Sequence, residues 1–541
     1  MVKSASILFL IWMASTSVII EGSRILISAP FGTKSHKNMY VPLVRELVSR
    51  GHDITVVTNY FTAEFAQLDG NNNVREIVLD QLTVDMSQYP NAFDSLLSSS
   101  SNYWWNLGFS HLLLLSMFRY SRQVTETLYG DARVQQMMAN DQFDLVIASQ
   151  VLSTASAPLA WHFGAPLIVT SPNSLFAGMA TVLGDDEHTS YVPFVFTRYT
   201  DQMNLGQRTI NTVVTKMCTF LQQLYEEWTI PAIVKEKGGI TACPPVQNII
   251  RNVTMVFTNS HPSFTYPRSL PPQVVEVGGL HCRPAQALPS HLETFLSSGR
   301  SSDDGGGFLL FSVGSLQRME DMPERVIQSF IGTFARLPGV RVIWQWKGQR
   351  RTDLPSNVLA IPWLPQQDLL GHSGCRGFIT HGGLNSLQEA IFHGVPVLGL
   401  PFGIDQYLNL ARAVNDGYAL QLEWRDVDES TLSAAIDKLL FNRSFSIAAR
   451  RLSGLLRDQL QSPLERAVFW TEYVIRHNGS MDHLRLGSRK LAPYQRSLID
   501  VYLVLVLIAS LPLWLVFLCL RCCWSTKTKA ATAMSKKSKQ E

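Results

Sequence analysis

The stretch Trp363–Gln406 reads WLPQQDLLGHSGCRGFITHGGLNSLQEAIFHGVPVLGLPFGIDQ, and it decides the fold of the C-terminal half. Its middle is a short apolar strand (377–380), followed by an HGG turn (381–383) and by a helix expected over 384–393, which Gly394 ends. The first amides of a helix have no internal partner and lie at the positive end of its dipole. The strand, glycine turn and helix therefore predict an anion site, where glycines let a diphosphate approach the backbone.

Polar and aromatic residues flank this turn on both sides. An HGG turn alone is explained equally well as a tight connection between a strand and a helix. Here Trp363 and Gln366 precede it, and Asp405 and Gln406 follow it after the next strand. A flat ring, an amide, a phosphate cradle and a polar pair suit a base, a ribose, a diphosphate and a sugar.

Four further motifs extend the pattern beyond this stretch. They are YPR (266–268), VGGLHCRP (277–284), FSVGS (311–315) and RAVFW (466–470) followed by RH (476–477). The whole set resembles the nucleotide-sugar signature of the UDP-glycosyltransferases, in the membrane-bound branch that resembles the animal UDP-glucuronosyltransferases. The resemblance implies a GT-B type α/β fold, with two doubly wound Rossmann-like domains facing across a cleft and one C-terminal transmembrane helix.

The resemblance also implies a role for each matching residue of the donor site. The chain departs from the family pattern directly after this set, because residues 407–409 (YLN) lack the usual acidic residue at the second place. The implied contacts are stacking on uracil by Trp363, ribose binding by Gln366 and Glu389, phosphate binding by Ser315, His381, Asn385 and Ser386 with Arg268 as a further diphosphate contact, and binding of the sugar hydroxyls by Asp405 and Gln406.

His36 is the base that the resemblance implies, at the start of the first helix in SHKNM (35–39). Imidazole suits this task because its pKa lies near neutral pH. From the residues alone, a histidine at a helix start behind a capping Ser35 is the better interpretation. In this family helix amides and side chains neutralise the UDP leaving group, so the resemblance implies no metal and no cofactor, with the UDP-sugar as co-substrate.

Ser149 stands where the family has the aspartate that orients this histidine, in FDLVIAS (143–149). A serine can hydrogen-bond the ring, but it cannot stabilise an imidazolium by charge, and losing the orienting carboxylate can cost orders of magnitude in rate. Asp144 lies at the opposite end of the strand and is not expected to substitute. Two interpretations stay open. One is a transferase that moves a hexose, glucuronic acid or glucose, from a UDP-sugar to a small lipophilic acceptor. The other is a UDP-sugar-binding protein with little catalysis.

The N-terminal half has the alternation of a doubly wound α/β domain. Apolar strands are expected over 24–28, 53–57, 143–148 and 165–169, and a helix over 38–50 buries the stripe Tyr40, Leu43, Val44 and Leu47. An aromatic segment (93–120) lines an apolar acceptor pocket, touches the membrane, or packs on the sheet, and its candidates are Tyr103, Trp104, Trp105 and residues 112–115. The expected boundaries are a signal peptide (1–22), an acceptor domain (23–269), a linker (270–307), a donor domain (308–450), C-terminal helices (451–500), a membrane span (501–520) and a cytosolic basic tail (521–541).

Charge and hydropathy place the chain at a membrane. Residues 1–22 have the pattern of a signal peptide, and residues 501–520 are uncharged and long enough to span a bilayer. The tail carries about +5 and the remainder about −2, so nothing resembles a nucleic-acid surface, and the basic flank favours a cytosolic tail. We expect a type I protein with a lumenal body in the endoplasmic reticulum membrane, in contact with lipid and associated with copies of itself or with relatives.

Short motifs refine this expectation. Lys537 and Lys539 have the spacing of a dilysine retrieval signal, although a solvated basic tail has the same composition. The four lumenal cysteines show no metal spacing and no evident pairing. Three sequons on the expected lumenal side are glycosylation candidates, at Asn252, Asn442 and Asn478.

Overall fold

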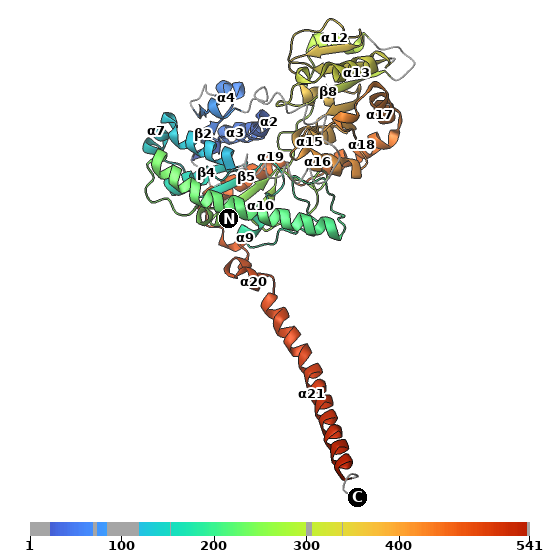
Figure 1. Cartoon of the computed structure of the whole chain (residues 1–541). Coiled ribbons are helices and arrows are strands. Elements are labelled where there is room, and N and C mark those ends of the chain that lie inside the picture. The colour runs from blue at the N-terminus through green and yellow to red at the C-terminus, as the bar shows by residue number, and fades with distance from the viewer. Residues whose placement is uncertain are drawn as a thin grey trace, which may run out of the picture. The chain divides into compact units, whose positions relative to one another are not determined.

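The computed structural model describes residues 22–68, 73–83, 118–151, 153–298, 306–337 and 339–537. The chain forms two compact units, the first ending at Leu484 and the second running from Arg485 to the C-terminus. The first unit contains two parallel sheets, one in each α/β half, with helices around them (Figure 1). The expected α/β class with two doubly wound sheets is therefore confirmed.

The first sheet has seven strands in the order β3-β2-β1-β4-β5-β6-β7. All neighbouring strands of this sheet pair in parallel. Buried β-branched and apolar strands that are joined by helices favour this arrangement. The order reverses between β1 and β4, where Ser28 lies opposite Ala148. The strands are β1 (Arg24–Ala29), β2 (Asp53–Thr58), β3 (Val74–Val78), β4 (Leu145–Ser149), β5 (Leu167–Ser171), β6 (Met255–Thr258) and β7 (Val274–Glu276).

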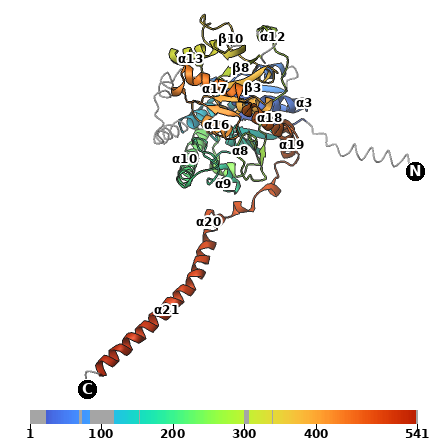
Figure 2. The same ribbon diagram turned by 90° about the vertical axis from the view of Figure 1, so that its right-hand side faces the viewer.

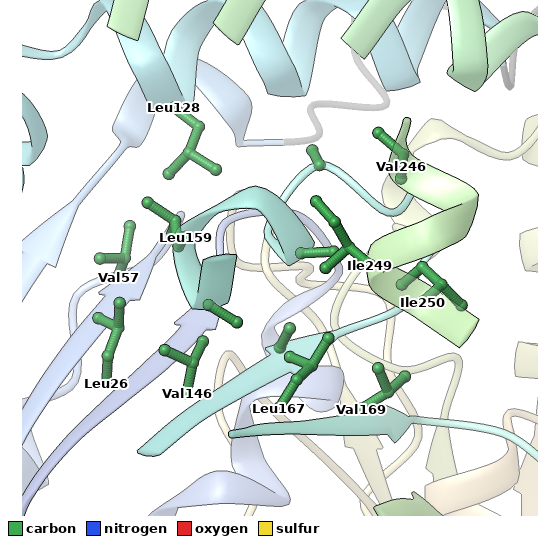
Figure 3. Packing of buried hydrophobic residues seen from close by; sticks show 14 of the residues in the cluster. Leu26, Val57, Leu128, Val146, Leu159, Leu167, Val169, Val246, Ile249 and Ile250 are labelled. Carbon is green, nitrogen blue, oxygen red and sulfur yellow. The ribbon is translucent and has the colours of Figure 1, made fainter. Parts of the chain in front are cut away.

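Helices cover both faces of this sheet. Figure 3 shows one face, where Leu26, Val146 and Leu167 of the strands meet Leu159 of α8 (Ala157–Phe163) and Ile249 of α11 (Val246–Arg251). On the other face lies α3 (Tyr40–Ser49), whose expected apolar stripe is buried. The helix expected over 38–50 is divided, because α2 (Lys34–Asn38) is a separate short turn before α3. Further helices of this half are α4 (Ala63–Leu68), α7 (Ala132–Asn140), α9 (Met179–Leu183) and the long α10 (Leu205–Gly238), and residues 118–130 are also helical.

The second sheet repeats this topology with six parallel strands in the order β10-β9-β8-β11-β12-β13. Its order reverses between β8 and β11, where Ser312 lies opposite Thr380. A cluster of stacked aromatic rings, including Phe311, Phe330 and Trp344, fills one face of the sheet. The strands are β8 (Gly307–Ser312), β9 (Val340–Gln345), β10 (Val358–Ile361), β11 (Cys375–Thr380), β12 (Val397–Gly399) and β13 (Ala419–Gln421), and the helices are α13 (Glu324–Ala335), α14 (Gln366–Leu370), α15 (Leu384–His393), α16 (Gln406–Asn415), α17 (Glu429–Phe441) and α18 (Arg443–Arg457).

Two connections differ from a simple division at residue 269. The segment expected as a linker (270–307) contributes β7 to the first sheet, because Val274 and Val275 are apolar and pair with β6. The same segment forms α12 (Ser290–Ser297), which packs on the second half. After α18 the chain crosses back, and α19 (Pro463–Arg476) buries Ala467 and Val468 against the first half (Figure 1). Each half therefore includes residues from beyond its expected boundary.

The second unit contains α20 (Pro493–Arg496) and α21 (Ile499–Lys537), the latter drawn as one long helix in Figure 2. Residues 499–532 of α21 contain a stretch that is long and apolar enough to cross a bilayer. The helix extends past the expected span (501–520) and includes most of the basic tail. Pro512 lies within the span, and no helix-breaking residue follows it.

Candidate functional site

A single cleft of about 380 Å³ lies between the two halves. It opens at the carboxyl ends of the strands where each sheet reverses its order, which is where doubly wound sheets bind ligands. In the first half the loop after β1 leads to His36, and in the second half the loops after β8 and β11 lead to Ser315 and His381. The sequence-predicted residues that line this one cleft are His36, Ser315, Trp363, Gln366, His381, Asn385, Ser386, Glu389, Asp405 and Gln406.

The HGG turn folds as a cradle around its own histidine. Gly382 has φ of +83°, a conformation that side chains disfavour. A Cβ on Gly383 would lie 2.4 Å from the His381 ring, and one on Gly314 would lie 2.6 Å from it. Burial, reinforced by the Lys347 ammonium, lowers the pKa of His381 to about 4. The imidazole is therefore neutral at physiological pH, and it faces the cleft beside the N-terminus of α15.

Glu389 lines the cleft and is held between two partners. Gln366 Nε2 donates to its Oε2 at 2.6 Å and to Ser386 Oγ at 3.3 Å. On the other side His281 Nε2 lies 3.4 Å from Glu389 Oε1. Burial opposes protonation of His281, but the Cys282 and Glu389 charges raise the pKa of His281 well above its usual value. His281 also lines the cleft, so the structure adds it to the residues that the sequence singled out.

Asp405 is the N-cap of α16 and Gln406 is its first residue, and both line the cleft. Asn409 Nδ2 donates to Asp405 Oδ2 at 2.8 Å, and burial raises the pKa of Asp405. Gln406 Oε1 accepts from the Phe402 amide at 2.7 Å, and Gln406 lines the cleft. Ile404, the residue before this pair, has φ of +57°, a strained conformation for a β-branched residue that fixes the approach to α16.

Asn385 joins the two halves. Its Nδ2 donates to the Ser35 carbonyl at 2.7 Å, and its Oδ1 accepts from Asn259 Nδ2 at 2.8 Å. Gln388, one turn further along α15, donates to Asn259 Oδ1 at 2.9 Å. The helix that follows the HGG turn is therefore bonded directly to the residue before His36.

His36 lies at the wall of the cleft with its ring against Gly32. A Cβ on Gly32, where φ is +146°, would lie 3.0 Å from His36 Nδ1, so glycine permits this close approach. The Thr33 amide donates to the same Nδ1 at 3.3 Å. Burial lowers the pKa of His36 to about 4. Because Nδ1 accepts a hydrogen bond, the neutral ring carries its proton on Nε2 in this arrangement.

Ser149 lies at the end of β4, but its hydroxyl belongs to a different network. The Ser149 hydroxyl lies near the Tyr40 phenol and acts to lower its pKa, and that phenol lies 2.5 Å from Thr170 Oγ1. Tyr40 is buried, and burial raises the pKa of its phenol despite these hydrogen bonds. No hydrogen bond joins Ser149 to His36 among the described residues, and Ser149 does not line the cleft.

Arg268 lies outside the main cleft and lines two side cavities instead. Its Nη1 donates to the Leu175 carbonyl at 3.3 Å, and burial lowers the pKa of its guanidinium. One of these side cavities shares Asp405 with the main cleft. The structure therefore places Arg268 next to the donor end without bringing it into the group around His381.

The remaining wall of the cleft is largely apolar. It is formed in the first half, and Phe31 packs on Tyr120 with ring centroids 5.4 Å apart. The aromatic segment expected in this role has its candidates at 103–105 and 112–115, which lie outside the described residues. No group of three or more His, Cys, Asp or Glu side chains suited to a metal occurs in the described parts of the chain. The apolar lining residues are Phe31, Tyr120, Val151, Phe176, Val195 and Phe196.

Comparisons with known proteins agree with this arrangement. The chain matches the protein family described as "UDP-glucoronosyl and UDP-glucosyl transferase" over residues 25–537. It is 31% identical to UDP-glucosyltransferase 2 of Dactylopius coccus, over 89% of each chain. It is 30% identical to human UDP-glucuronosyltransferase 2A2, over 97% of this chain and 96% of the relative.

Solved structures share the fold. The glycosyltransferase VinC, solved in complex with DTDP, superposes with a TM-score of 0.54 at 18% identity, over 84% of this chain and all of that one. The calicheamicin glycosyltransferase CalG4 gives a TM-score of 0.53 at 18% identity, over 84% of this chain and 99% of that one. The family match, the two relatives and the shared two-sheet fold together identify this chain as a member of the UDP-glucuronosyl and UDP-glucosyl transferase family.

Proposed function

We propose that this protein moves a hexose, glucuronic acid or glucose, from a UDP-sugar to a small lipophilic acceptor, with His36 as the base. The donor lies on the second half, with uracil on Trp363 and the diphosphate between His381 and the N-terminus of α15. The acceptor lies against the apolar wall of the first half. Its hydroxyl loses a proton to His36 as it attacks the anomeric carbon, and UDP leaves with the electron pair of the broken bond.

One observation carries this proposal, the direct bond between the two halves at the reacting centre. Asn385 Nδ2 donates to the Ser35 carbonyl at 2.7 Å, so the first turn of the donor helix is held next to the residue preceding His36. A base and a phosphate cradle on opposite sides of one cleft are the two parts that sugar transfer requires. Asp405 and Gln406, at the end of the same cleft, have little use without a sugar.

The test is UDP release by the full-length protein in microsomes, with UDP-glucose and UDP-glucuronate each offered to a panel of phenols, alcohols, amines and thiols. We expect release that requires both a donor and an acceptor. The variant His36→Ala removes the base, and His291→Ala is the matched control, because His291 is exposed on α12 outside the cleft. Failure of the wild type to bind either donor would overturn the proposal.

A second function, UDP-sugar binding with little catalysis, is favoured by the surroundings of His36. The Thr33 amide donates to Nδ1, and Ser149 is engaged by Tyr40. A base oriented for catalysis has the opposite arrangement, with a proton on Nδ1 held by a carboxylate and a free Nε2. Donor binding with no UDP release across the whole acceptor panel would establish this second function in place of the first.

We further propose that the body lies in the lumen of the endoplasmic reticulum, that α21 anchors it, and that the tail is cytosolic. The apolar helix at residues 499–532 and the basic residues after it support this orientation. Asn252, Asn442 and Asn478 are all exposed, as acceptors of lumenal glycosylation need to be. Lipid around α21 and copies or relatives of this chain are the proposed partners, and no cofactor beyond the UDP-sugar is proposed.

Protease added to sealed microsomes tests the topology. It is expected to remove a C-terminal tag and to leave the body intact and sensitive to a glycosidase. Digestion of the body would contradict a lumenal location. Replacing Lys537 and Lys539 by Ser is expected to let part of the protein leave the endoplasmic reticulum, and an unchanged distribution would reject the retrieval signal.

A further inference from the structure

Lys34 is a cation of the first half that reaches across the cleft to the donor half. It is the first residue of α2, two positions before His36, and its side chain lines the cleft. The Lys34 Nζ lies 4.2 Å from the ring centroid of Trp363, within the range of a cation–π interaction. Trp363 is 56% exposed and lines the cleft. The Lys34 ammonium lies over one face of its indole.

A base that stacks on Trp363 from the cleft, as the proposed function requires, meets the Lys34 ammonium on that indole face. A base and an ammonium cannot both stack on it, because each needs contact with the same ring atoms. The cation–π contact of an exposed lysine is weak, about 0.5–1 kcal/mol. A stacked base contributes more, about 1–3 kcal/mol. The base therefore wins the competition, and the Lys34 ammonium has to move when a nucleotide binds.

The surroundings determine where a displaced ammonium finds a partner. Lys34 and Lys347 lie close enough for the charge of Lys34 to help lower the pKa of Lys347, after the larger effect of burial. Lys347 in turn acts on His381, and its Nζ donates to the carbonyls of Gly314 and Ser315 at 3.2 and 3.0 Å. Neither ammonium forms an ion pair with a carboxylate within the described residues.

The carboxylates of the cleft are already engaged. Glu389 is held by Gln366 and His281, and Asp405 is held by Asn409. The region around His381 thus gathers two lysine charges and the positive end of α15, a ten-residue helix, and the acidic residue that acts on Lys347 is Glu320, which lies outside the lining of the cleft. An anion with more than one negative charge satisfies this arrangement, and the four-carbon stem of lysine lets its ammonium turn toward it.

We propose that Lys34 and the nucleotide base compete for the same face of Trp363, and that the displaced ammonium binds the diphosphate of the donor. This inference rests on the proposed function, and it adds a residue of the acceptor half to the donor site. It gives donor binding a direct effect on the segment that carries His36, because Lys34 belongs to the same short helix. The ligand class is a nucleoside diphosphate. A nucleoside without phosphate competes with the Lys34 ammonium for Trp363 and offers that ammonium no new partner.

The test compares uridine with UDP by calorimetric titration of the full-length protein in detergent. The variant is Lys34→Gln, which keeps the length of the side chain and removes the charge. Uridine is expected to bind roughly 2- to 5-fold more tightly, because the competing ammonium has gone. UDP is expected to bind roughly 5- to 20-fold more weakly, because a charge-assisted contact is lost. The opposite signs cannot come from a general loss of structure.

Two controls complete the experiment. Lys438→Gln makes the same charge change on exposed α17, outside the cleft, and is expected to leave both affinities within 2-fold of the wild type. Lys34→Arg keeps the charge and is expected to restore UDP binding. Uridine and UDP shifting in the same direction, or Lys34→Gln behaving as Lys438→Gln does, would overturn the inference. A wild type that binds neither ligand would overturn the proposed function itself, so the two failures are distinguishable.

Discussion

The two α/β halves have the same strand order, but the contacts of their site residues differ. In the donor half the side chains bind one another, as Gln366, Glu389 and His281 do, and as Asp405 and Asn409 do. In the acceptor half the two residues expected to act together, His36 and Ser149, each have another partner. The comparison teaches that a shared topology fixes where a site lies, whereas the contacts of each side chain decide what the site is prepared to do.

Removing the base is the strongest test of this contrast. His36→Ala is expected to lower the rate of transfer to phenols by about 10²- to 10⁴-fold, the usual contribution of a general base. UDP affinity is expected to stay within 2-fold, because the proposed donor contacts do not include His36. Initial rates and UDP titrations measure the two quantities separately. A rate equal to that of the His291→Ala control would show that another group accepts the proton.

Removing the stacking ring tests the donor half. Trp363→Ala is expected to weaken UDP binding by roughly 5- to 150-fold, from a stacking loss of about 1–3 kcal/mol. Trp228→Ala, which removes a highly exposed tryptophan from α10, is the matched control. Titration of UDP into both variants gives the comparison. Equal affinities in the two folded variants would remove Trp363 from the nucleotide site.

Sequence alone predicts the donor site more completely than the acceptor site, and the reason is the range of the contacts. The strand, the HGG turn and helix α15 are local, and the helix has the bounds expected from its glycine stop. The position of Gly383 against His381 follows from neighbouring residues. Ten of the twelve expected catalytic and donor-binding residues line one cleft, while Arg268 and Ser149 lie beside it.

The contacts that sequence does not predict join distant segments. Asn385 and Ser35 are 350 positions apart, and nothing in either motif names the other. Tyr40 was expected only as part of a buried stripe, yet its phenol engages Ser149. β7 was placed in a linker because prolines and glycines surround it, although pairing with β6 makes it part of the first sheet. In each case tertiary packing decides the outcome, and local pattern carries no signal for it.

Restoring the carboxylate of the acceptor half is expected to need two changes. A carboxylate at position 149 meets the Tyr40 phenol first, because the side chain at that position already lies near this hydroxyl. Ser149→Asp alone is therefore expected to change transfer to phenols by less than about 3-fold. Combined with Tyr40→Phe, it is expected to raise that rate by about 10-fold, since the carboxylate is then free to hold the His36 ring.

Matched phenol and amine acceptors measure this effect. A neutral amine carries its own lone pair, so its rate is expected to rise less than that of the phenol. Tyr40→Phe alone is the control, because it removes the hydroxyl without adding a charge. A full gain from Ser149→Asp by itself would mean that the Tyr40 phenol does not restrain the position.

The smallest expected effect concerns His36 and His381, which follow β1 and β11 at the points where the two sheets reverse their order. Burial lowers the pKa of both to about 4, but only His381 has a neighbouring cation, Lys347, as a second cause. The unfolded chain therefore binds protons at these rings before the folded protein does. Their contribution to stability is present above pH 6.5 and is lost as the pH falls toward 4.

Replacing Lys347 separates the two halves in this respect. Lys347→Gln is expected to raise the pKa of His381 and to leave that of His36 unchanged, because the shift of His36 comes from burial. Between pH 6.5 and 4 the unfolding temperature of the variant is expected to fall by about 1–3 °C less than that of the wild type. Thermal unfolding in detergent across this range measures the difference, with Lys438→Gln correcting for the lost charge. If the variant and this control had the same pH profile, the electrostatic part of the His381 shift would be negligible. Burial would then be sufficient to lower the pKa of the histidine in each half. The second half would differ from the first only in the hydrogen bonds around Glu389 and Asp405.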